Sequence, residues 1–145
     1  MKEPIYLDTS ALAKWYLNEA RSDDFAAFVG AEPRPIVSRL TAVEIRSLLE
    51  RRRRSRQITT ATVRKVVAAF ERDVRDGHLE MHALEDAHAI LAGELLNRLA
   101  AHPLRTLDAL HLAVATSLEL GRIATADRVL AAAAESLGLE VERFD

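Results

Sequence analysis

The fold is decided by the stretch Pro4-Ile5-Tyr6-Leu7-Asp8-Thr9-Ser10, near the start of the chain. Its short, mainly apolar run is typical of a buried strand, and Asp8 follows directly at the carboxyl end of that strand. Thr9 or Ser10 can then cap a helix that continues to Asn18. The stretch therefore predicts a strand-to-helix unit with a carboxylate at its junction.

The same alternation of short strands and helices continues along the chain. Strand patterns occupy residues 4–7, 35–38, 79–84, 122–125 and 139–142. Helix patterns occupy residues 10–18, 23–29, 41–54, 85–100, 106–120 and 127–137, with a further helix from Thr59 or Thr60 to Val74. Such alternation is typical of right-handed crossovers that build a parallel sheet. The sequence predicts a three-layer α/β/α fold, in which helices cover both faces of a small parallel sheet.

Length and composition indicate one globular domain that spans residues 1–145. The chain has 145 residues, of which 49% are hydrophobic and 29% are charged. A chain of this size can bury a core without disulfides or a structural metal. It contains no Cys, which excludes thiol catalysis, Cys-based zinc sites and a disulfide framework.

Charge and hydropathy restrict the partners and the location that we expect. The formal net charge is −2, so any contact with RNA or DNA must be local. The longest stretch without a formal charge, residues 109–118, is far shorter than the ~20 apolar residues of a membrane span. The first residues also lack the apolar core of a secretory signal. We therefore expect a cytoplasmic protein that makes no membrane contact.

Four acids lie at the predicted carboxyl edge of the sheet. Asp8 and Asp127 come after short strands. Glu44 and Asp108 lie in the first turns of helices that begin at the same edge. Because functional crevices of parallel sheets form at this edge, the topology suggests a place where the four carboxylates meet.

Each of these acids also has a purely structural explanation. Asp8 and Asp127 can cap the helices that follow them, and Asp108 can interact favourably with a helix dipole. Glu44 can close a capping box by reaching back to the backbone N–H of Thr41.

A cluster of carboxylates would need a cation. Two carboxylates about 4 Å apart repel by roughly 4 kcal/mol at an effective dielectric constant near 20. Mg²⁺ and Mn²⁺ are hard ions that bind carboxylate oxygens together with water and phosphate. If the fold brings the four acids together, they predict a Mg²⁺ or Mn²⁺ site.

Four motifs in order give the chain a family resemblance. They are Ile5-Tyr6-Leu7-Asp8-Thr9-Ser10-Ala11-Leu12, Leu40-Thr41-Ala42-Val43-Glu44-Ile45, Leu104-Arg105-Thr106-Leu107-Asp108-Ala109-Leu110-His111-Leu112-Ala113 and Ile123-Ala124-Thr125-Ala126-Asp127. Together they resemble the PIN-domain ribonucleases and, more closely, the VapC-type toxins of bacterial toxin–antitoxin pairs. The resemblance covers almost the whole chain and implies a metal-dependent endoribonuclease.

The resemblance also implies site residues and partners. The catalytic Mg²⁺ or Mn²⁺ site would be lined by four acids: Asp8, Glu44, Asp108 and Asp127. Three hydroxyl residues match positions that hold carboxylates or water, and helix capping explains them equally well: Thr9, Ser10 and Thr125. The implied partners are an RNA substrate, a VapB-like antitoxin and a second copy of the chain in a homodimer.

The dense basic block of the sequence is Arg51-Arg52-Arg53-Arg54. It fits a solvated helix end that complements the helix dipole, a rim that contacts RNA phosphates, or an antitoxin-docking surface. The sequence leaves these three interpretations open. His111, one turn after Asp108, is expected to be partly buried and bonded to a polar neighbour rather than to a metal.

Two other functions fit parts of the pattern. A non-catalytic PIN scaffold would bind RNA or protein, but the full acidic set argues against it. A phosphoryl-transfer domain of the receiver or haloacid-dehalogenase type also has an Asp after its first strand. Here, however, Asp8-Thr9-Ser10 lacks the second acid of an Asp-x-Asp motif, and no acidic pair precedes it. We therefore favour the endoribonuclease.

Overall fold

A single parallel sheet organises residues 2–145, the part of the chain that the computed structural model describes. Its five strands are β1 (Ile5–Leu7), β2 (Pro35–Ser38), β3 (Glu80–His82), β4 (Arg122–Thr125) and β5 (Glu140–Arg143). They lie in the order β3-β2-β1-β4-β5, and every neighbouring pair is parallel. The strand order reverses beside β1, which creates a switch point of the kind where ligands bind to parallel sheets.

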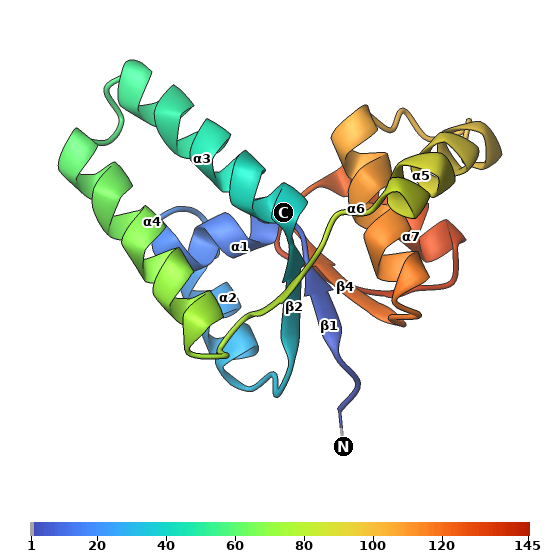
Figure 1. Cartoon of the computed structure of the whole chain (residues 1–145), viewed down its shortest axis with the longest axis horizontal. Coiled ribbons are helices and arrows are strands. Elements are labelled where there is room, and N and C mark those ends of the chain that lie inside the picture. Colours follow the sequence, from blue (N-terminus) through green and yellow to red (C-terminus); the bar gives the residue numbers. More distant parts are fainter. Residues whose placement is uncertain (1) are drawn as a thin grey trace.

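Helices cover both faces of this sheet (Figure 1). On one side lie α1 (Thr9–Tyr16), α2 (Ser22–Gly30), α3 (Arg39–Arg54) and α4 (Thr60–Arg75). On the other side lie α5 (Asp86–Arg98), α6 (Thr106–Ser117) and α7 (Arg128–Ser136). The predicted three-layer α/β/α fold is confirmed.

Strand β1 is apolar at every position, without the alternation of apolar and polar residues that a half-exposed strand shows, because both of its faces are buried. Ile5 and Leu7 pack into the apolar cluster on the side of α1 to α4, whereas Tyr6 packs into the cluster formed with α5 to α7. All three side chains are 0% exposed. A central parallel strand is buried on both faces, so it holds Asp8 at a fixed position at its end.

Helix α3 begins two residues earlier than predicted. Ser38 is its N-cap, and the backbone N–H of Ser38 donates to the Thr41 hydroxyl at 3.3 Å. Thr41 is therefore the third residue of the helix rather than its cap. The structural alternative for Glu44, a capping box with Thr41, therefore does not form, and the Glu44 carboxylate is free to turn toward the carboxyl edge of the sheet.

Helix α6 is shorter than predicted, because it ends at Ser117 instead of Leu120. The cause is Glu119, which adopts a left-handed backbone conformation with φ 55° two residues before Gly121. Strand β3 is also shorter than residues 79–84, and α5 ends at Arg98 instead of Ala100. These differences concern element ends and leave the topology unchanged.

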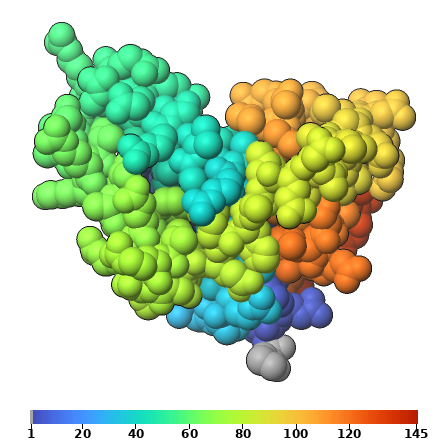
Figure 2. Space-filling view, in the orientation of Figure 1, coloured from blue at the N-terminus to red at the C-terminus, as the bar shows by residue number. Residues whose placement is uncertain are grey.

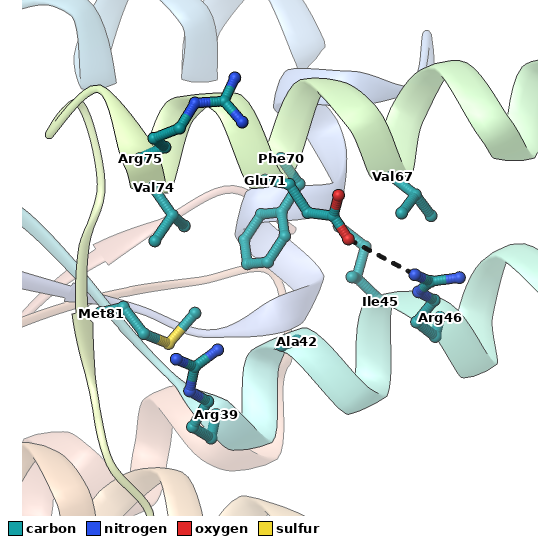
Figure 3. A pocket seen from close by; sticks show the side chains of 10 residues that line it. All are labelled: Arg39, Ala42, Ile45, Arg46, Val67, Phe70, Glu71, Val74, Arg75 and Met81. Carbon is teal, nitrogen blue, oxygen red and sulfur yellow. Dashed lines mark ion pairs between the residues drawn. The ribbon is translucent and has the colours of Figure 1, made fainter.

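A cavity of about 340 Å³ lies between α3 and α4 (Figure 3). Its apolar part includes Ile45 and Phe70, and Arg39 and Arg75 stand at its edge. The Arg46 guanidinium forms an ion pair with Glu71 across it at 3.5 Å. None of the predicted site residues lines this cavity.

Within residues 2–145, each helix is too short or too polar to cross a membrane.

Candidate active site

The four predicted acids come from four different elements and line one cavity of about 160 Å³: Asp8, Glu44, Asp108 and Asp127. Asp8 follows β1 and caps α1, while Asp127 follows β4 and caps α7. Glu44 belongs to α3 and Asp108 to α6. The surface is notched between these two helices (Figure 2). Asp8 and Asp127 thus cap a helix and line the cavity at the same time.

Asp8 is the most enclosed of these acids, with only 3% of its surface exposed. Its Oδ1 accepts from the backbone N–H of Ala11 at 2.9 Å, and its Oδ2 accepts from the Thr125 hydroxyl at 2.6 Å. The Ser10 hydroxyl lies 2.8 and 2.9 Å from the two oxygens. Desolvation by burial raises the pKa of Asp8 above its usual range, although these donors oppose the effect.

The hydroxyls of Ser10 and Thr125 connect the ends of β1 and β4. Ser10 Oγ accepts from the backbone N–H of Ala126 at 3.0 Å, and Thr125 Oγ1 accepts from the backbone N–H of Asp127 at 3.0 Å. Each hydroxyl therefore has a backbone donor on one side and the Asp8 carboxylate on the other. This arrangement fixes the orientation of Asp8 relative to the start of α7.

Glu44 is held by a hydroxyl and an imidazole. Thr9 Oγ1 donates to Glu44 Oε1 at 2.9 Å, and His111 Nε2 bonds to the same oxygen. Burial acts to raise the pKa of Glu44, but the hydrogen bonds and charge of His111, together with Thr9, lower it below its usual range. The contact between His111 and Glu44 could not be predicted from the sequence, because the two residues are far apart along the chain.

His111 is fully buried rather than partly buried, with 3% of its surface exposed. Its Nδ1 lies 2.6 Å from the hydroxyl of Tyr6, which in turn lies 2.9 Å from Ser38 Oγ. Burial also raises the pKa of Tyr6, so this hydroxyl stays protonated. The prediction that His111 bonds to a polar neighbour is confirmed. The chain of contacts runs from the middle of β1 to the carboxylate of Glu44.

Asp108 lies in the first turn of α6, where both the backbone and the side chain of Arg105 approach its carboxylate. The backbone N–H of Arg105 donates to Asp108 Oδ2 at 3.2 Å. Its guanidinium lies 3.8 Å from Asp108 Oδ2 and 3.9 Å from Asp127 Oδ2. Burial raises the pKa of Asp108, and the negative charge of Asp127 adds to this effect. By sequence, Arg105 was one of four basic residues near the motifs, with Lys14, Arg46 and Arg64, and nothing in the sequence ranked them.

The arginine block divides between different surroundings. Arg51 lines the acidic cavity. Arg52 instead pairs with Glu19 at 2.6 Å, and Arg53 pairs with Glu50 at 2.9 Å. Arg54 lines a second hollow at the end of α3, together with Arg51 and Arg52. The structure therefore brings one of the four arginines to the acids.

The donors in the acidic cavity suit a hard divalent cation such as Mg²⁺ or Mn²⁺, because they are carboxylate oxygens. Asp8 keeps lone-pair capacity, since Ser10 has one hydroxyl hydrogen and donates to one oxygen at a time. Across residues 2–145, no three His, Asp or Glu side chains are arranged to share an ion. Glu44 is engaged by His111, while Arg105 lies near Asp108 and Asp127. The carboxylates are therefore suitable ligands for the ion. To bind it, Glu44 would have to give up His111, and Asp108 and Asp127 would have to give up Arg105.

Comparison with known proteins identifies similar sequences and folds. A family model described as "PIN domain" matches residues 5–136. Over 140 residues the chain is 34% identical to Ribonuclease VapC46 of Mycobacterium tuberculosis, and the match covers 94% of this chain and 95% of that protein.

Solved structures share the fold at lower identity. The crystal structure of Mycobacterium tuberculosis VapC20, described as a toxin that cleaves the sarcin-ricin loop, has a TM-score of 0.72 at 20% identity. The match covers 89% of this chain and 94% of that chain. VapBC2 from Rickettsia felis, bound to a promoter DNA fragment, has a TM-score of 0.68 at 14% identity, with 98% and 99% covered.

Proposed function

Because the chain belongs to the PIN-domain family, we propose that it is a metal-dependent endoribonuclease of the VapC type. The proposal depends most on one observation, the convergence of four acids from separate elements on one cavity. Capping alone would not require acids from α3 and α6 and from the ends of β1 and β4 to line the same cavity. Binding of a divalent cation would account for this arrangement, because the cation would offset the repulsion between the four negative charges.

Each acid would contribute differently to the site. Asp8 would provide the fixed ligand, because three donors hold its carboxylate and it cannot move far. The other acids are more accessible, with side-chain exposures of 21% for Glu44, 13% for Asp108 and 26% for Asp127. They would face the ion and its water from the open side of the cavity. A bound Mg²⁺ or Mn²⁺ supplies an activated water and neutralises charge on a phosphodiester.

The hydroxyls and the arginines would act around these acids. Thr9, Ser10 and Thr125 would orient carboxylates, because each donates to one of them. Arg51 would attract the RNA backbone to the cavity edge, which an acidic site would otherwise repel. Since Arg52 and Arg53 are paired with acids of this chain, we assign them no phosphate contact.

The proposal includes partners and a location. We propose a VapB-like antitoxin as partner, supported by the structural likeness to VapC chains in VapBC complexes. We also propose that the chain forms a homodimer and is located in the cytoplasm. Two exposed apolar side chains next to Glu44 and Asp108 in the sequence support a protein contact on this surface, namely Val43 at 67% and Leu107 at 44% exposure.

Divalent ions test the proposal. Purified protein should cut total cellular RNA into discrete fragments with Mg²⁺ or Mn²⁺, lose this activity in EDTA, and regain it when the ion is added back. Cleavage that persists in EDTA would contradict the metal dependence. RNA binding without cleavage in any of these ions would favour the non-catalytic scaffold instead.

A further inference from the structure

Arg105 is a cation already present at the acidic cavity. Its guanidinium lies 3.8 Å from Asp108 Oδ2 and 3.9 Å from Asp127 Oδ2, so it sits between the two outer acids. Its side chain is 81% exposed. Contacts of this length on an exposed side chain are ion pairs that can break at small cost.

The backbone keeps this guanidinium close to the acids. Arg105 is the residue before α6, and its N–H donates to Asp108 at 3.2 Å. The backbone of Arg105 is therefore anchored to Asp108, one of the two acids that its guanidinium approaches. Arg51 lines the same cavity from α3, but no ion pair links it to any of the four acids in residues 2–145.

We propose that Arg105 is the resident counter-cation of the metal-free site, and that a divalent ion must displace its guanidinium from Asp108 and Asp127 in order to bind. This inference rests on the proposed function, because it takes the acidic cavity as the metal site. It explains why the described acids do not converge on one point: the two outer carboxylates are turned toward a cation of the chain itself.

Arg105 is in this sense a positioning residue. It lowers the repulsion between Asp108 and Asp127 when no metal is bound, and it competes with the metal for the same oxygens. After displacement its charge would remain beside the cavity that Arg51 also lines, where it could attract a phosphate backbone.

Calorimetric titration with Mn²⁺ alone tests the competition. Arg105→Gln should bind Mn²⁺ about fivefold more tightly than the wild type, the size expected when one exposed charge about 4 Å from the acids is removed. Arg105→Lys keeps the charge and should bind much as the wild type does. The matched control is Arg75→Gln, at a side chain that is 71% exposed, forms an ion pair with Asp76 and does not line the acidic cavity.

The results separate the inference from the proposed function. Unchanged or weaker Mn²⁺ binding by Arg105→Gln overturns the inference, as does an equal gain in Arg75→Gln or no Mn²⁺ binding by any of the proteins. Tighter binding by Arg105→Gln alone supports it, even if the wild type fails to cleave RNA. A wild type that cleaves RNA while Arg105→Gln binds Mn²⁺ unchanged would leave the proposed function standing and refute the competition.

Discussion

Asp8 is a carboxylate whose ionised form the fold disfavours. Its burial raises its pKa, so the folded chain binds this proton more tightly than the unfolded chain does. The contribution of Asp8 to stability is therefore complete below the ordinary Asp pKa of about 3.9 and is lost as the pH rises through the raised value. Such a conflict between charge and burial is typical of functional sites.

We expect Asp8→Asn to be more stable than the wild type at pH 7.5 in EDTA. The amide carries no charge to bury, and Asn caps a helix as well as Asp does. The difference in Tm should shrink as the pH falls toward 4. Thermal unfolding across this pH range measures it, with Asp24→Asn, at a side chain that is 65% exposed, as the control. A lower Tm for Asp8→Asn at pH 7.5 would contradict this account.

Thr125 provides a second prediction for a single residue. Its hydroxyl is buried, donates to Asp8 and accepts from the N–H of Asp127. Thr125→Val should lower the free energy of unfolding by about 1–3 kcal/mol and slow RNA cleavage by about 10–100-fold. Thr125→Ser retains the hydroxyl and should stay within a few-fold of the wild type. Equal activity of the Val and Ser variants would show that the hydroxyl does not position Asp8.

Helix α3 shows where prediction from sequence reached its limit. The sequence pattern predicted a helix over residues 41–54, and the structure contains one at Arg39–Arg54. Its start depends on whether Ser38 or Thr41 caps the helix, and both residues suit that role. The choice determined what Glu44 contacts: a capping box within α3, or Thr9 and His111. Local sequence favours the first, and only tertiary contacts between distant segments reveal the second.

The same helix carries Glu44 and Arg51 to the cavity, so its packing supports the site. Leu49 is 0% exposed within the apolar cluster of α1 to α4. Leu49→Ala should lower the free energy of unfolding by about 2–5 kcal/mol, because it removes apolar contacts and leaves a cavity. Val43→Ala, on the exposed face of α3, should change it by no more than about 0.5 kcal/mol. Urea denaturation compares the two variants, and equal effects would contradict the assigned packing.

For the whole molecule, the order of strands and helices was predictable because each element has its own local pattern. The layered fold and the gathering of the four acids followed from the rule that crossovers place carboxyl ends at one edge. The Tyr6, His111 and Glu44 contacts did not follow, since they join residues from β1, α6 and α3. Neither did the different contacts of the arginines: Arg51 lines the acidic cavity, whereas Arg52 and Arg53 form ion pairs with Glu19 and Glu50.

The central claim is that the cavity of the four acids is the site of RNA cleavage. The most direct test compares cleavage of total cellular RNA in Mn²⁺ by the wild type, Asp8→Asn and Asp24→Asn, each checked for folding. We predict that Asp8→Asn loses about 100-fold or more of the activity, since even outer partners of metal ligands contribute about 10–100-fold. Asp24→Asn should cleave as the wild type does. A folded Asp8→Asn variant with wild-type cleavage would contradict the assignment of this cavity.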